Sequence, residues 1–185
     1  RLEAAGIENL RPRLAELTHD LPPTDETVRR LIETVAARHA AGPADPVAGA
    51  TVFARACAGC HARGGVGERI GPQLDGIGQR GRDRLLEDLL DPSRHVDDAF
   101  RTTILQLHDG RVVTGLRLRD EGGDLILADA LGKELRVAAD DVAATRVSRL
   151  SPMPANVREL VGEDNLPHLL AYLLESAAPA PAAAP

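Results

Sequence analysis

The chain of 185 residues is long enough for one compact domain with an appendage, or for two small domains. Its net charge is −6 and its acidic and basic residues are interspersed, so it lacks the basic stripe that a nucleic-acid partner requires. No apolar run approaches the roughly eighteen residues that span a bilayer, and the opening residues Arg1-Leu2-Glu3 lack the features of a signal peptide. The chain also lacks a start methionine, so we expect a processed or excised piece of a longer protein, with no membrane span.

Residues 1–44 predict a helical lead-in. Asp25-Glu26 follows Pro22-Pro23 as a helix start, and Gly42-Pro43 ends the pattern. Between these signals, apolar residues recur at helical spacing: Val28, Leu31, Ile32, Val35 and Ala36. Leucines spaced along residues 2–17 indicate an earlier helix. Two helices bury little by themselves, so this segment is either the end of a preceding domain or an appendage packed on the main one.

A second unit begins near Asp45-Pro46, where the proline suits the first turn of a short helix that runs to about Ala56. A loop with two cysteines follows. The glycine-rich residues 62–81 then predict irregular structure. Residues 83–90 predict another short helix, which Asp91-Pro92 ends.

After about residue 100 the hydrophobic pattern changes from helical to alternating. Short apolar segments separated by Asp109-Gly110, Gly122-Gly123 and a turn with Gly132 are typical of β-hairpins. A small antiparallel β module is therefore expected over about residues 100–150, with strands near 102–107, 112–118, 125–127, 135–137 and 145–147. A helix is expected to return at about 163–176. The Ala/Pro tail, residues 177–185, is expected to be disordered.

The chemistry of the chain is concentrated in Cys57-Ala58-Gly59-Cys60-His61. Two thiols at this spacing can add across the two vinyl groups of a haem as thioethers, and the histidine after the second cysteine then coordinates the iron. The sequence therefore predicts one covalent haem c. The scarcity of aromatic residues agrees with this prediction, because a large planar cofactor would supply the bulk that the core lacks.

The cysteine pair allows two other interpretations. A thioredoxin-like redox pair is expected in a βαβ setting, whereas this motif follows a short helix and enters a glycine-rich loop. A structural zinc site needs four ligands, and the chain has no cysteine beyond Cys57 and Cys60. Haem is therefore the preferred interpretation.

The second axial position of the iron is assigned to Met153, the single methionine of the chain. It lies between two prolines in Ser151-Pro152-Met153-Pro154, which restrict the loop, and its thioether is a soft ligand suited to low-spin haem iron. A lone methionine also serves to fill gaps in a core. The alternative ligands are His95, His108 and His168, of which His95 is preferred because it lies in a loop after Pro92-Ser93.

Residues 46–176 resemble a class I cytochrome c with a β insertion, and more narrowly the haem-binding domain family of the Planctomycetes–Verrucomicrobia type. The resemblance rests on the elements Cys57 to His61, Gly71-Pro72-Gln73-Leu74, Gln79-Arg80, Leu85-Leu86 through Asp91-Pro92-Ser93, His108-Asp109-Gly110, Ser151 to Pro154, and Leu170-Ala171-Tyr172-Leu173. It implies a mainly α fold around haem with a small antiparallel β insertion, in a domain covering residues 45–176.

The resemblance also implies roles for single residues. Pro72 matches a proline whose carbonyl accepts the Nδ1–H of the ligand histidine. Arg80 matches a position that often pairs with a haem propionate, and Leu74 matches an apolar residue against the haem. Gly49 and Phe53 match positions where the first helix packs against the last, near Tyr172.

A haem iron held by His61 and Met153 has no position left for a substrate, so we expect an electron-transfer domain and not an enzyme. The resemblance implies a redox partner protein, such as an attached or docked dehydrogenase, and export to the periplasm or beyond, where haem is attached to such motifs. The alternative is a haem-based gas-ligand or sensor domain with an open sixth position. The β module is expected to be a passive insertion, and the oligomeric state is left open.

Overall fold

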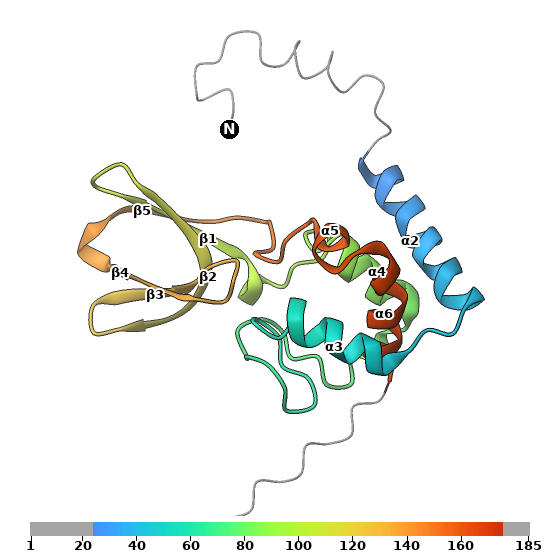
Figure 1. Cartoon of the computed structure of the whole chain (residues 1–185). Coiled ribbons are helices and arrows are strands. Elements are labelled where there is room, and N and C mark those ends of the chain that lie inside the picture. Colours follow the sequence, from blue (N-terminus) through green and yellow to red (C-terminus); the bar gives the residue numbers. More distant parts are fainter. Residues whose placement is uncertain (1–23, 176–185) are drawn as a thin grey trace, which may run out of the picture.

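The structure, a computed structural model, describes residues 24–175 and consists of a helical part and an antiparallel sheet. Figure 1 shows the helices gathered on one side of the molecule and the sheet on the other. Two connecting segments, residues 91–101 and 148–156, join them. Each part has its own cluster of buried apolar side chains. Within the described residues, no helix combines the length and apolarity needed to cross a membrane.

The expected helix before Gly42 is α2, Thr24–Ala41. It packs against the α4 and α6 helices, and its Val35 is buried in their shared core together with the half-buried Leu31 and Ile32. The apolar face of the described part of the lead-in is thus covered by the main helices. The earlier helix expected over residues 2–17 lies outside the described residues, as does the tail 177–185.

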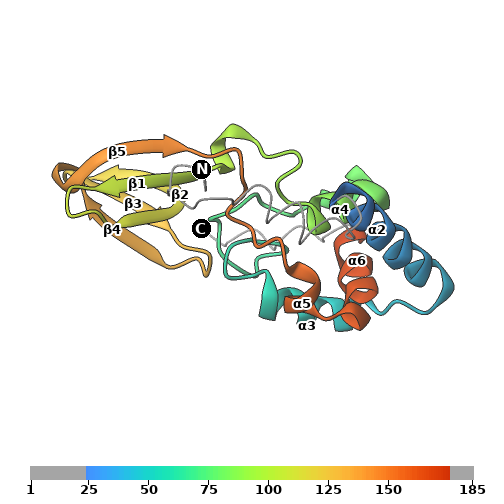
Figure 2. The ribbon, with the colours of Figure 1, turned by 90° about the horizontal axis from the view of Figure 1, so that it is seen from above.

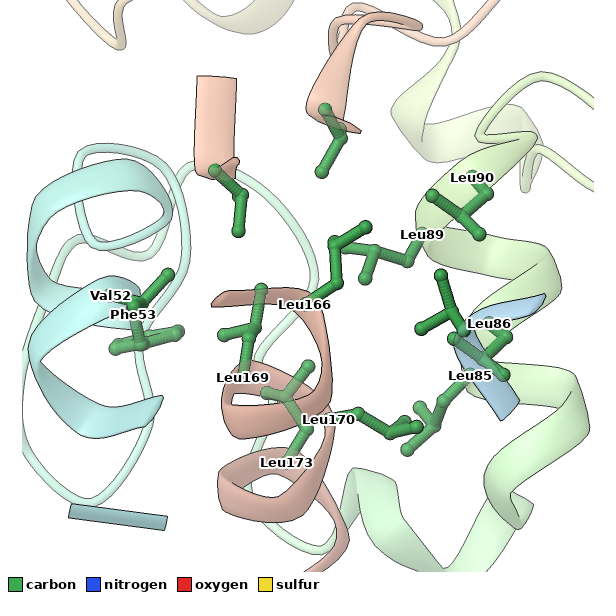
Figure 3. Close-up of a cluster of buried hydrophobic side chains, with 13 residues drawn as sticks. Val52, Phe53, Leu85, Leu86, Leu89, Leu90, Leu166, Leu169, Leu170 and Leu173 are labelled. Carbon is green, nitrogen blue, oxygen red and sulfur yellow. The ribbon is translucent and has the colours of Figure 1, made fainter. Parts of the chain in front are cut away.

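The centre of the helical part is the crossing of α3, Pro46–Ala56, and α6, Leu166–Leu174. Asp45 caps α3 by accepting a hydrogen bond from the backbone N–H of Val47 at 2.8 Å. Phe53 on α3 and Tyr172 on α6 place their ring centroids 5.5 Å apart, as the resemblance implies. Figure 3 shows leucines of α4, Arg82–Leu90, and of α6 pointing into the same apolar cluster.

The prediction of one helix over residues 163–176 was wrong in its first part. The chain instead forms α5, Val157–Val161, then a 3₁₀ turn, Glu163–Asn165, and only then α6. Gly162 has a φ of 85°, which ends α5, and Pro167 fits only the first turn of a new helix. The five residues of α5 are too few to show a helical period. A second 3₁₀ turn, Ile77–Arg80, interrupts the loop expected over 62–81.

The β module is a five-stranded antiparallel sheet in the order β4-β3-β2-β1-β5, as expected in kind and place. Its five strands make the fold a mixed one and not mainly α. The cluster inside the sheet contains Leu105, Leu107, Leu127 and Val137 and no residue of a helix. The strands are β1 Thr102–Leu107, β2 Val112–Glu121, β3 Asp124–Ala128, β4 Glu134–Ala138 and β5 Val142–Val147.

The crossing of α3 and α6 depends on Gly49. A Cβ at this position would lie 2.1 Å from the backbone oxygen of His168 and 2.7 Å from Cβ of Tyr172. In an ordinary helix, Gly→Ala adds about 1 kcal/mol of stability. We expect Gly49→Ala to lower the free energy of unfolding by about 1–3 kcal/mol instead, because the backbone of α6 must move.

Urea unfolding followed by circular dichroism, at equal cofactor loading, measures this effect. Thr51→Ala, on the exposed side of α3, is the control and should change the free energy of unfolding by less than about 0.5 kcal/mol. A Gly49→Ala variant as stable as the parent protein would contradict the proposed importance of this contact.

Candidate functional site

The cysteine motif forms a tight turn directly at the end of α3. Cys57 is the C-cap of the helix, and its carbonyl accepts hydrogen bonds from the N–H groups of Cys60 (3.1 Å) and His61 (2.9 Å). The carbonyl of Cys60 in turn accepts from the N–H groups of Ile70 (3.1 Å) and Gly71 (2.7 Å). These bonds fix the positions of both thiols and of the histidine relative to α3.

The ring of His61 is oriented by the loop that returns from the glycine-rich stretch. Its Nδ1 lies 2.8 Å from the carbonyl oxygen of Pro72. Because a carbonyl only accepts, Nδ1 donates its hydrogen to Pro72. Nε2 makes no hydrogen bond to any of the residues 24–175. Nε2 is thus the ring nitrogen that remains available as a ligand.

Gly71 allows the backbone to lie directly against this ring. A Cβ at residue 71 would be 2.8 Å from Cε1 and 3.0 Å from Nδ1 of His61. Any side chain here would therefore push the imidazole away from its hydrogen bond with Pro72. The sequence stretch Gly71-Pro72 thus supplies both the space for the ring and the acceptor that orients it.

Both cysteines are free thiols in the structure. Burial, and then the charge of Cys60, raise the pKa of Cys57 to about 11. Burial, and then the carboxylate of Asp129, raise the pKa of Cys60. Redox-active cysteines have lowered pKa values and commonly sit at the N-terminal end of a helix, whereas Cys57 sits at the C-terminal end of α3 and the sheet is antiparallel. The thioredoxin-like interpretation therefore does not fit.

Met153 lies on a short loop that is tied at both ends. Its N–H donates to the hydroxyl of Ser151 (3.1 Å), and the N–H of Ser151 donates to the hydroxyl of Ser93 (3.3 Å). The half-buried side chain packs against the helical core, as do Leu74 and Cys57. The fold thus places the predicted second ligand and the first predicted attachment residue against one apolar cluster.

Arg80, expected to pair with a haem propionate, has a carboxylate partner within the protein. Its Nη1 lies 2.8 Å from Oδ2 of Asp88 on α4, and about half of its side chain is exposed. The described residues contain no group of three or more His, Cys, Asp and Glu side chains placed to hold a metal ion, so the further ligands that a zinc site needs are not among them.

The alternative histidines lie in three different settings. His95 is exposed, with Nε2 3.8 Å from a carboxylate oxygen of Glu87, and His108 is exposed beside the β1–β2 turn. His168 lies at the start of α6, where its Nδ1 accepts the backbone N–H of Asp45 at 2.9 Å. This bond ties the N-cap of α3 to α6, so His168 has a structural contact that its position in the sequence did not reveal.

Arg63 is a residue of the site region that the sequence did not single out. It is 3% exposed, its guanidinium lies 3.9 Å from the ring centroid of Tyr172, and its Nη2 donates to the carbonyl of Glu175 at 2.6 Å. A cation at this point stabilises the C-terminal end of α6. Nothing in the sequence indicated this role, because a single arginine in a glycine-rich stretch is typical of a solvated loop.

Comparison with known families bears on this part of the chain. Residues 46–106 match the family model described as Cytochrome c. The match includes α3, both cysteines, His61 and α4, and it ends within β1. No curated protein matches the chain. The segment that carries the cysteine motif is thus similar to cytochrome c domains, and in such a domain a Cys-x-x-Cys pair implies covalently attached haem c and a redox partner.

The raised pKa of Cys57 has a measurable consequence in protein made without haem attachment. Since the thiolate is the reactive form, a pKa of about 11 should slow alkylation of Cys57 at neutral pH. With Cys60→Ser removing the second thiol, we expect iodoacetamide to react at least about tenfold more slowly in buffer than in urea, where an unfolded thiol has a pKa of about 8.5.

For the folded Cys60→Ser variant, the rate measured against pH should rise at a higher pH than it does in urea, because burial, the larger cause of the raised pKa of Cys57, remains. The Cys57→Ser variant, which reports on the less buried Cys60, is the comparison. Equal rates in buffer and in urea for Cys57 would show that burial does not hold this thiol in its protonated form.

Proposed function

We propose that the chain is a c-type cytochrome domain that carries one haem c on Cys57 and Cys60 and transfers single electrons. The observation that supports this most directly is the hydrogen bond between Nδ1 of His61 and the Pro72 carbonyl. It presents Nε2 as a ligand immediately beside two free thiols, which is the donor set that covalent haem requires. When bound, the haem supplies a one-electron iron couple.

The residues of the site have separate tasks in this proposal. Cys57 and Cys60, whose positions are fixed by the turn at the end of α3, would anchor the group through thioether bonds. His61 would bind the iron, and Pro72 would hold the imidazole plane and make Nε2 a stronger donor. Leu74, half-buried in the apolar cluster, would cover a haem face and exclude water.

Met153 is proposed as the second axial ligand. Its loop is held by the Ser93 and Ser151 hydroxyls, so the thioether has a restricted range of positions. A six-coordinate iron leaves no site for a substrate, which makes electron transfer the expected activity and catalysis unexpected. Arg80 would pair with a propionate by leaving or sharing Asp88.

The wider setting follows from the sequence resemblance. We assign the chain to the Planctomycetes–Verrucomicrobia type of haem-binding domain, extending over residues 45–176 and including the sheet, with residues 1–44 leading in. Its electrons would come from an attached or docked oxidoreductase, such as a fused dehydrogenase, and pass to a downstream acceptor. Export to the periplasm accompanies this assignment, because haem attachment to such motifs takes place outside the cytoplasm.

Visible spectra of the protein, expressed together with haem-attachment machinery, test the ligand set. We expect a low-spin oxidised spectrum with a sulfur–iron band and a reduced spectrum that carbon monoxide does not change. Met153→Ala should lose the sulfur–iron band and bind carbon monoxide. His95→Ala, which removes an exposed alternative ligand, is the matched control and should leave both spectra unchanged.

Other outcomes separate the alternatives. A parent protein that binds carbon monoxide would indicate an open sixth position and favour the gas-ligand or sensor function. Loss of the low-spin spectrum in His95→Ala, and not in Met153→Ala, would move the second ligand to His95. Absence of covalent haem in the parent protein, with the cysteines intact, would contradict the proposal as a whole.

A further inference from the structure

The sheet contacts the cysteine motif through the turn between β3 and β4, residues 129–133. Gly132 in this turn has a φ of 80°, and a Cβ there would lie 2.2 Å from the carbonyl oxygen of Gly59 and 3.3 Å from Cδ1 of Ile70. The backbone of the turn at Gly132 thus lies directly against the backbone at Gly59, the residue just before Cys60. In Figure 2 this turn is the part of the sheet that reaches toward the loop after α3.

Asp129 builds this turn with one of its two carboxylate oxygens. Oδ1 accepts the N–H groups of Leu131 (2.8 Å) and Lys133 (2.9 Å), and the carbonyl of Asp129 accepts the N–H of Gly132 at 3.0 Å. These bonds shape the turn so that Gly132 meets Gly59. Oδ2 makes no hydrogen bond or ion pair with any residue in the range 24–175.

The carboxylate of Asp129 therefore carries a negative charge that no described side chain pairs. Because Asp129 begins the turn whose Gly132 lies against Gly59, this charge is held close to the loop that contains both cysteines. Asp109 in the β1–β2 turn makes a useful contrast. It accepts the N–H of Arg111 in the same kind of turn, but its charge is paired with the Arg111 guanidinium at 2.7 Å.

We propose that the sheet positions a charge: its β3–β4 turn lies against the loop that would attach the haem, and it holds the Asp129 carboxylate close to this loop, where the charge lowers the reduction potential of the haem. This inference rests on the proposed function. Oxidised iron carries one more positive charge than reduced iron, so a fixed negative charge nearby stabilises the oxidised form. Asp129 acts through space and is a positioning residue, not a ligand.

The test is a redox titration of the haem-loaded protein with Asp129→Asn. Asparagine keeps the oxygen that accepts the two turn N–H groups, so the variant removes charge and preserves the turn. We expect the ratio of reduced to oxidised protein at a fixed ambient potential to rise about threefold, which is about 28 mV for one electron. The effect should shrink at high salt, because partly exposed charges are screened.

Asp109→Asn is the matched control, since it changes the net charge equally in another turn of the same sheet. In Figures 1 and 2 that turn lies at the end of the sheet away from the helices. We expect it to change the ratio by much less than threefold. Equal shifts in the two variants would show a general charge effect and overturn the inference.

Gly132→Ala provides a second arm that tests the contact itself. Gly110, with a φ of 88° and no neighbouring atom within 4 Å of a Cβ, is its control. Both substitutions strain a left-handed turn, but only Gly132→Ala forces the turn away from Gly59. The reduction potential of the haem should rise in Gly132→Ala and not in Gly110→Ala. In the Gly132→Ala background, Asp129→Asn should raise the potential by less than it does in the parent protein.

The outcomes distinguish this inference from the function on which it rests. A parent protein without covalent haem would overturn the proposed function and the inference with it. A parent protein with a reversible one-electron couple that Asp129→Asn leaves unchanged would overturn the inference alone, and the sheet would then be a passive insertion with respect to the potential.

Discussion

The close crossing of α3 and α6 at Gly49 is the contact on which the rest of the helical part depends. With no side chain on Gly49, the backbones approach until Phe53 meets Tyr172 and His168 reaches the cap of α3. The direction of α3 is thereby fixed, and since α3 ends at Cys57, so is the start of the cysteine turn. Arg63, stacked on Tyr172 and bonded to the end of α6, ties the chain after the motif to the same crossing.

The site shows how one short motif acquires its chemistry from its surroundings. Burial, and then the charge of Cys60, raise the pKa of the Cys57 thiol to about 11, which does not suit a residue that cycles between thiolate and disulfide. The Pro72 carbonyl accepts the Nδ1 hydrogen of His61 and leaves Nε2 as the nitrogen that can bind a metal. Each effect comes mainly from the fold around the motif and not from the motif itself.

The sheet is a second structural unit with a separate core. Its contact with the cysteine motif lies at the β3–β4 turn. Gly132 in the β3–β4 turn lies against Gly59 in the cysteine loop. This contact couples the position of the sheet to that of the two cysteines. A rigid sheet is well suited to this task, because its hydrogen-bonded strands hold a turn in place more firmly than an isolated loop would. Charge carried on such a turn keeps a constant distance from the site.

The sequence by itself determined the chemical nature of the site and the kinds of element around it. Two signals carried this information: the motif from Cys57 to His61, and the change of hydrophobic period near residue 100. Both are local, so they can be recognised from neighbouring residues without knowledge of the fold. Most strand and helix positions followed from these signals. The exceptions are α5 and the 3₁₀ turns at 77–80 and 163–165, which are too short for periodicity to show. Only the tertiary structure decided which distant groups meet: Asp88 with Arg80, Asp45 with His168, and Gly132 with Gly59. Contacts between residues far apart in the chain are set by how the elements pack, and neither spacing nor composition records that packing.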